Sequence, residues 1–206
     1  MKKLTSLLLI LVSALIVGCS DDSQPTQGKQ YQQLPADLSK LNLSPVTEVF
    51  SLNCGHCRSM ENEIPQIEKL TGQNIGKAHV TFNESAQIGA MIYYAAEMQL
   101  GGTPDHAMME ELFAATQMGN GATLTDKKAA LDAAFQSRNL TSPYDFNQQQ
   151  QSQLFEAIKV ADEITTQGQI KAVPTFIING KYQIITSGHK DVADIAKTIT
   201  FLLSQP

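Results

Sequence analysis

Residues 50–58 read Phe50-Ser51-Leu52-Asn53-Cys54-Gly55-His56-Cys57-Arg58, and two different periodic patterns meet in this stretch. The run from Val46 to Leu52 is rich in strand-forming residues and predicts a strand. The residues after the stretch repeat apolar side chains at helical spacing, namely Met60, Ile64, Ile67 and Leu70. The stretch therefore predicts a strand-to-helix turn, with Cys54 at the start of the helix and Cys57 about one turn inside it.

The two cysteines suit redox chemistry at such a turn. Unpaired N–H groups and the positive end of the helix dipole favour an anion at a helix start. A thiolate is such an anion, so we expect a lowered pKa for Cys54 and a reactive sulfur, with Cys57 resolving the mixed disulfide. His56 lies between them and can stabilise the Cys54 thiolate; an exposed loop histidine without a role is the alternative.

Zinc binding is the competing use of a Cys-x-x-Cys motif. Zinc sites take several closely spaced ligands, and this chain has no second cysteine pair. Its other histidines, His79, His106 and His189, are scattered along the chain. We therefore expect no metal. A purely structural disulfide is also disfavoured, because a bridge across a two-residue gap removes little entropy from the unfolded chain.

The first residues predict export. A basic start and an apolar run too short to span a bilayer are typical of a signal peptide, here residues 1–18. Ile16-Val17-Gly18-Cys19 resembles the bacterial lipobox, so Cys19 is the expected lipidation site; an ordinary signal peptide with an incidental cysteine is the alternative. The polar residues 19–30 are expected to tether the domain. An exported chain works in an oxidising compartment.

Composition narrows the classes of partner. The net charge is −5 and no basic patch is present, so nucleic acid is not the expected partner. A length of 206 residues allows one domain with an elaboration. Seven methionines suggest an adaptable apolar surface, with filling of the core as the alternative.

Apolar periodicity predicts an α/β unit followed by a helical block. His79–Phe82 is the expected second strand, parallel to the first, and Pro65 should kink or break the helix between them. Residues 85–169 read as helix throughout. Four helical segments are expected there: Ile88–Met98, a second from Thr103 until Gly119, Thr125–Phe135 and Asp145–Thr166. The apolar face expected for the last of them comprises Leu154, Phe155, Ile158 and Ile164.

The end of the chain returns to sheet. Val173–Ile178 predicts a strand, Asn179-Gly180 a hairpin turn, and Lys181–Ile185 the return strand. Asp191–Leu203 predicts a closing helix. We thus expect a small α/β domain, in two parts at 31–84 and 170–206, interrupted by an all-helical insertion at 85–169.

The order of these motifs resembles the thioredoxin fold of the DsbA family, in a lipoprotein form. The resemblance rests on Cys54-Gly55-His56-Cys57, on Val173-Pro174 before a late strand, and on the helical insertion between them. It extends over 28–203. Further matching segments are Gly28-Lys29-Gln30-Tyr31, Glu48-Val49-Phe50-Ser51 and Asn179-Gly180-Lys181-Tyr182.

The resemblance implies further site residues. Pro174 would be cis, lie against Cys54, and leave the backbone edge at Val173 free to pair with substrate; an ordinary trans proline at a strand start is the alternative. Glu48 matches a buried acid of the family that could accept a proton from Cys57, and Lys77 aligns with a lysine near that acid. Exposure of Glu48 on an edge strand is the alternative.

The implied protein is a periplasmic thiol:disulfide oxidoreductase, anchored by lipid on Cys19 and acting without a cofactor. It would be a monomer that donates a Cys54–Cys57 disulfide to reduced, unfolded exported proteins. A membrane quinone-linked partner of the DsbB type would then reoxidise it. One departure bears on the direction of electron flow: the family's usual middle pair is Pro-His, whereas Gly55-His56 is the pair of protein disulfide isomerases. A disulfide isomerase or reductase, and a non-catalytic chaperone on the same scaffold, are the alternatives.

Overall fold

In a computed structural model, residues 24–119 and 121–206 are described. The expected signal peptide at 1–18 and the expected lipidation site Cys19 lie outside the described residues, as does the first part of the tether. Within the described ranges, no helix is both long enough and apolar enough to cross a membrane.

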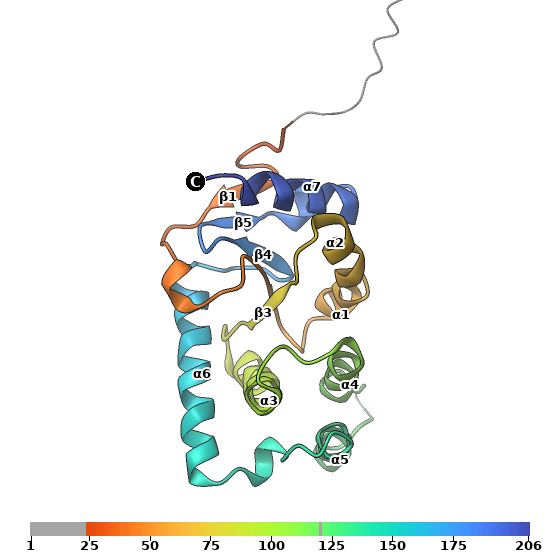
Figure 1. Ribbon diagram of the computed structural model, residues 1–206. Helices are drawn as coiled ribbons and strands as arrows, with labels where there is room; N and C mark the ends of the chain where they lie inside the picture. Colours follow the sequence, from red (N-terminus) through yellow and green to blue (C-terminus); the bar gives the residue numbers. More distant parts are fainter. Residues whose placement is uncertain (1–23, 120) are drawn as a thin grey trace, which may run out of the picture.

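Five strands of the described chain form one mixed sheet in the order β1-β5-β4-β2-β3 (Figure 1). The strands are β1 (Tyr31–Gln33), β2 (Val46–Phe50), β3 (Gly76–His79), β4 (Thr175–Ile178) and β5 (Tyr182–Ile184). β2 and β3 are parallel, as predicted, and the other neighbouring pairs are antiparallel. All residues of β2 are buried, because β4 and β3 flank the strand and both faces of the sheet are covered. The strand that leads into the Cys-x-x-Cys is thus an interior strand.

The second strand lies earlier than the sequence indicated. β3 ends at His79, whereas the prediction began there and ran to Phe82. The chain leaves the sheet because the Asn83 side chain caps α3 (Glu84–Leu100), accepting a hydrogen bond from the Ala86 amide at 3.0 Å. Phe82, expected in the strand, is 42% exposed.

Helices cover both faces of the sheet. α1 (Gly55–Glu61) and α2 (Ile64–Thr71) follow β2, and the predicted break falls between them, with Pro65 in the first turn of α2. α2 and α7 (Val192–Leu203) pack on one face (Figure 1). The side chains of that core include Val46, Ile64, Ile67, Phe176, Ile178, Ile195, Ile199 and Leu202.

The insertion between β3 and β4 is helical, as predicted. It comprises α3, α4 (His106–Thr116), α5 (Leu124–Gln136) and α6 (Gln148–Gln167), and α6 runs back to the sheet (Figure 1). Side chains that accept backbone hydrogen bonds cap the start of each helix; they belong to Asn83, Asp105, Thr123 and Asn147. Asp105 explains why α4 begins after Thr103-Pro104, where the helix was expected to start.

Burial bears on two expectations about apolar residues of the insertion. Met108 and Met109 are fully buried and fill the core, whereas Met91 is 43% exposed, so neither alternative holds for all of these methionines. Phe155 was wrongly placed on the buried face of α6, since it is 68% exposed. α6 buries Leu154, and Phe155 is rotated from it by about 100° around the helix axis, toward solvent.

Replacing Gly180 by alanine should destabilise the protein more than replacing Gly101. Both glycines have left-handed φ angles, of 67° and 69°, and such a conformation costs an ordinary L residue roughly 1–2 kcal/mol. A Cβ at Gly180 would also lie 2.5 Å from the Ser39 nitrogen, whereas one at Gly101 would meet nothing within 4 Å. Urea unfolding should therefore show a larger loss of unfolding free energy for Gly180→Ala. Equal losses would contradict the packing of the β4–β5 hairpin on Ser39.

Candidate active site

Cys54 occupies the N-cap of α1, and its sulfur accepts a hydrogen bond from the Cys57 amide at 3.2 Å. Both cysteines are free thiols; Cys54 is half-buried, and Cys57 is fully buried. The Cys57 thiol donates a hydrogen bond to the Cys54 sulfur and is the largest cause of a lowered Cys54 pKa. Burial opposes this effect, whereas the backbone amides of Cys57 and His56 and the His56 side chain add to it. The resulting pKa of Cys54 is about 6. The hydrogen bond to Cys54, burial and the charge of Glu48 raise the pKa of Cys57. The two sulfurs therefore prefer opposite protonation states at neutral pH.

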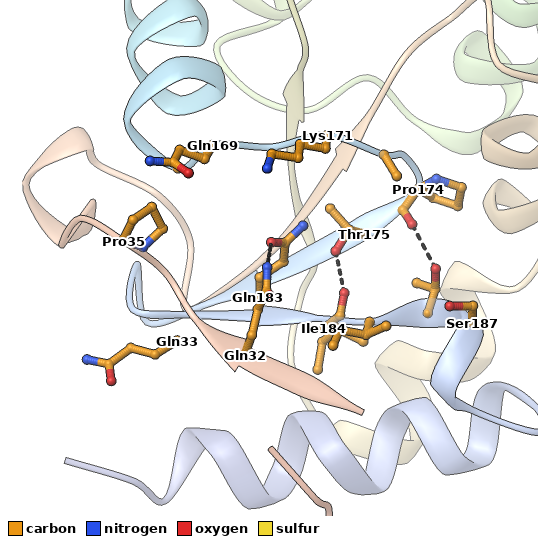
Figure 2. A pocket seen from close by; sticks show the side chains of 14 residues that line it. Gln32, Gln33, Pro35, Gln169, Lys171, Pro174, Thr175, Gln183, Ile184 and Ser187 are labelled. Atoms are coloured by element: carbon orange, nitrogen blue, oxygen red, sulfur yellow. Dashed lines mark hydrogen bonds between the residues drawn. The ribbon is translucent and has the colours of Figure 1, made fainter. Parts of the chain in front are cut away.

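The segment before β4 faces Cys54. The Val173-Pro174 peptide bond is cis, as the resemblance implied, and the Val173 carbonyl oxygen lies 3.6 Å from the Cys54 sulfur. Two threonine hydroxyls hold this segment: Thr175 donates to the Ile184 carbonyl at 2.5 Å, and Thr186 donates to the Pro174 carbonyl at 3.1 Å (Figure 2). β5 and the turn after it thus fix Val173-Pro174 beside the reactive sulfur.

A pocket of about 550 Å³ lies next to Pro174 (Figure 2). β1, β5 and the chain entering β4 line it, and in that lining the Gln32 amide donates to the side-chain oxygen of its register partner Gln183 at 2.8 Å. Neither Cys54 nor Cys57 belongs to its lining. The pocket adjoins the segment that faces the sulfurs but is separate from the sulfurs themselves.

Three charged side chains are buried together behind the cysteines. Glu48 on β2 pairs in register with Lys77 on β3, and the Lys77 ammonium contacts both Glu48 Oε2 and, at 2.7 Å, Glu61 Oε2. The side chains of all three are at most 4% exposed, so the alternative of an exposed Glu48 is wrong. Burial raises the pKa of Glu48, and Lys77 offsets this in part. Burial alone would lower the pKa of Lys77. The carboxylates of Glu48 and Glu61 outweigh burial, so the pKa of Lys77 is raised.

Glu61 and His106 belong to this cluster, although the sequence analysis assigned them no role. His106 Nδ1 lies 3.2 Å from Glu61 Oε1, and the His106 side chain is 48% exposed. A signal for Glu61 was present in the sequence, since it follows Cys57 by four residues and so shares its helix face. His106 comes from another element, and no local pattern indicated it.

Gln117, at the end of α4, is a further residue that the sequence analysis missed. Its side-chain amide donates to the Leu52 carbonyl at 2.8 Å and to the Cys54 carbonyl at 3.2 Å. The neighbouring Thr116 hydroxyl donates to the Leu52 carbonyl at 3.0 Å. The helical insertion thus holds the backbone of the cysteine loop directly.

His79 holds the same loop from the side of the sheet. Its Nε2 accepts a hydrogen bond from the Leu52 amide, and its Nδ1 donates to the Val80 carbonyl, both at 2.8 Å. Burial lowers the pKa of His79 to about 4, so the ring is neutral at neutral pH, as this pair of bonds requires. In the described part of the chain, no three His, Cys, Asp or Glu side chains are grouped so that they could hold a metal ion.

Comparison with known proteins places this site in a family. Residues 43–200 match a family model described as Thioredoxin. A curated relative, the thiol:disulfide interchange protein DsbA of Pseudomonas syringae, is 28% identical over 181 residues, which are 84% of this chain and 81% of the relative.

Solved structures agree with this placement. DsbA from Proteus mirabilis has a TM-score of 0.66 and 20% identity, covering 88% of this chain and 98% of that one. DsbA from Xylella fastidiosa has a TM-score of 0.68 and 15% identity, covering 88% and 97%. These matches confirm the resemblance to DsbA and the thioredoxin fold with a helical insertion. The chain therefore belongs to the thioredoxin family.

Proposed function

We propose that this protein is a thiol:disulfide oxidoreductase that introduces disulfide bonds into exported proteins by exchange with a Cys54–Cys57 disulfide. The observation that carries the proposal is the opposite shift of the two thiol pKa values, lowered for Cys54 and raised for Cys57. A stable Cys54 thiolate favours the dithiol form, which makes the disulfide a good electron acceptor. The name of the Pseudomonas syringae relative agrees with this activity.

The geometry supports a two-step exchange. A substrate thiolate attacks Cys54 Sγ, the Cys54–Cys57 bond breaks, and Cys57 leaves with the electron pair and takes up a proton. A second substrate thiolate then attacks the substrate sulfur of the mixed disulfide and releases Cys54 as a thiolate. The substrate loses two electrons and two thiol protons, of which one ends on Cys57 and one in solvent. Cys54 is the sulfur under attack because it is the accessible one.

Glu48, His56, Val173 and Pro174 receive supporting roles in this proposal. Glu48 exchanges a proton with Cys57, since it is buried near that thiol and its Oε1 has no hydrogen-bond partner among the described residues. His56 stabilises the Cys54 thiolate. Val173-Pro174 presents a backbone edge to an extended substrate, because the Val173 carbonyl already points at the Cys54 sulfur.

The proposed setting is the periplasm, with the signal peptide at 1–18 and lipid on Cys19 providing export and anchoring. The substrates are reduced, unfolded exported proteins, and a DsbB-type quinone-linked membrane protein is the proposed electron acceptor. Exposed apolar side chains of the helical insertion, and of the segment between β3 and α3, would hold such substrates loosely. They include Phe82, Ile88, Met91 and Phe155.

Disulfide isomerisation is a second candidate, and the middle pair Gly55-His56 favours it. An isomerase must be kept reduced, whereas an oxidase works from the disulfide. The reduction potential of the Cys54–Cys57 couple, together with its redox state trapped in cells, separates the two functions.

The purified disulfide form should oxidise a reduced two-cysteine peptide, and Cys54→Ser should abolish this activity because the attacked sulfur is gone. Peptide oxidation is followed by mass spectrometry. As a control, Cys57→Ser given a peptide disulfide should accumulate a mixed disulfide on Cys54, since the resolving thiol is missing. No oxidation by the unaltered protein would overturn the proposed function.

Cys54 should titrate near pH 6 in the reduced protein, as measured by the ultraviolet absorbance of its thiolate. The folded pKa is lower than the unfolded value of about 8.5, so the unfolded state binds more protons between the two. Cys54 therefore stabilises the reduced protein fully above pH 8.5, and this contribution is lost as the pH falls through about 6. Cys54→Ala should lack that pH dependence of unfolding free energy; an identical profile would contradict the assignment.

Gln117→Leu should loosen the cysteine loop. The substitution removes two hydrogen bonds to backbone carbonyls and should cost about 1–3 kcal/mol of unfolding free energy. It should also move the Cys54 titration toward higher pH, because the loop no longer holds the sulfur against the Cys57 amide.

The matched control is Gln99→Leu. Gln99 bonds the backbone at Ala95 and Thr141 within the insertion, far along the chain from the cysteines. The Gln99→Leu variant should lose a similar amount of unfolding free energy and leave the Cys54 titration unchanged. A shift of equal size in both variants would show that Gln117 has no special role at the site.

A further inference from the structure

The pocket beside Pro174 contains a buried hydrogen-bond donor that the protein leaves unpaired. Gln183 on β5 is 8% exposed, and its side-chain oxygen accepts a hydrogen bond from Gln32. The nitrogen of the same Gln183 amide has no hydrogen-bond partner among the described residues. Figure 2 shows this nitrogen turned away from Gln32 and into the pocket. Because an unpaired buried donor is costly, the pocket suits a ligand that brings an acceptor.

The charge of the pocket favours an acceptor that is negative. Lys171 is the one charged residue among those that line the pocket in the described chain, and it forms no ion pair with another described residue. Figure 2 shows the Lys171 ammonium facing the same open space as the Gln183 nitrogen. A carboxylate has two acceptor oxygens, so it can bind an amide N–H and an ammonium at once. The lining is therefore complementary to a carboxylate.

The pocket begins one residue away from the contact with the reactive sulfur. The Val173 carbonyl oxygen lies 3.6 Å from Cys54 Sγ, and the next residue, Pro174, lines the pocket. Thr186, which also lines it, holds the Pro174 carbonyl at 3.1 Å. An extended substrate beside Val173 advances about 3.3 Å per residue, and its successive side chains point to opposite faces. A side chain about two residues from the substrate cysteine can therefore enter the pocket.

We propose that this pocket is a specificity subsite that binds an acidic side chain of the substrate polypeptide, close in sequence to the cysteine that reacts. Gln183 Nε2 and the Lys171 ammonium donate to its carboxylate. The inference rests on the proposed thiol–disulfide exchange and adds the class of substrate that the site prefers. Neither residue touches a reacting atom, so both are binding residues.

Other side chains complement the pocket less well. A lysine or arginine of the substrate brings a charge of the same sign as that of Lys171. An apolar side chain covers the Gln183 nitrogen without supplying an acceptor, which is unfavourable for a buried polar group. A glutamine can accept from Gln183 but gains no ion pair with Lys171, so glutamine is the matched comparison for glutamate.

The test compares reduced two-cysteine peptides that differ at one position, which carries Glu, Gln or Lys. This position is varied on either side of the first cysteine. The rate constant for oxidation by the disulfide form is divided by the rate constant with oxidised glutathione, which corrects for the effect of the neighbouring charge on the peptide thiol. We expect the native protein to favour Glu over Gln at one position by up to about fivefold, the size of one exposed ion pair. Added salt should reduce this preference.

Variants of Lys171 separate the pocket from the charge of the whole protein. Lys171 is exposed, so its substitution should leave the fold intact. Lys171→Gln should remove the preference for Glu over Gln, and Lys171→Glu should shift it toward the Lys peptide. The matched control is Lys197→Gln, which removes the same charge from an exposed position on α7 outside the pocket and should keep the native preference.

Binding is also measured without any reaction. A peptide with serine in place of both cysteines should move the side-chain amide resonance of Gln183 when it carries Glu, and not when it carries Lys. That resonance is assigned by its absence in Gln183→Leu.

Three results would overturn the subsite and leave the proposed function intact. They are equal corrected rates for the Glu and Gln peptides, a preference that Lys197→Gln loses as fully as Lys171→Gln, and a Gln183 resonance that the Glu peptide does not move. Failure of the unaltered protein to oxidise any of the peptides would instead overturn the proposed function.

Discussion

The site depends on the contact between the Cys54 sulfur and the first turn of α1. The Cys57 amide and thiol both donate to that sulfur, so a negative charge on Cys54 is stabilised where the helix has unpaired N–H groups. The same contact opposes ionisation of Cys57. One local arrangement thus makes the two thiols unequal. The neighbouring elements keep this arrangement in place. The His79 ring on β3 accepts a hydrogen bond from the Leu52 amide, and the Val173 carbonyl contacts the Cys54 sulfur.

The buried charges are a costly feature that stability alone would not require. Removing an ion from water costs several kcal/mol even after relaxation, and apolar residues of similar volume often replace buried ion pairs without loss. Here Lys77 lies between two carboxylates, and one oxygen of Glu48 has no hydrogen-bond partner in the described chain. Side chains alternate along β2, so Glu48 lies on the same face as Val46 and Phe50, toward α1 and the cysteines. The position of this acid makes sense as part of the proposed proton exchange.

The helical insertion contributes to the site through both ends of α4. At its end, Gln117 bonds the carbonyls of Leu52 and Cys54. At its start, His106 contacts the buried Glu61. A change in how α4 sits on α1 would therefore alter the cysteine loop and the charged cluster together. The insertion therefore helps to position the residues of the active site, in addition to any surface that it offers to substrates.

Local patterns in the sequence determined much of this protein. The strand before Cys54, the helix after it, the break at Pro65 and the hairpin at Asn179-Gly180 each depend on residues within a few positions of one another, so spacing and turn chemistry predicted them. The resemblance added the cis bond at Pro174. Misplacement of the second strand and of Phe155 shows where local patterns fail, because a capping side chain and the contacts of α6 decided those features.

Tertiary structure alone decided the environment of the cysteines. Glu61 meets His106 across 45 residues of sequence, and Gln117 meets Leu52 across 65. No periodicity encodes such pairs, because they form only when the insertion folds back on the sheet. Burial has the same origin: a sequence shows that Glu48 and Lys77 can carry charge, but only the packed fold removes them from water and so shifts their pKa values.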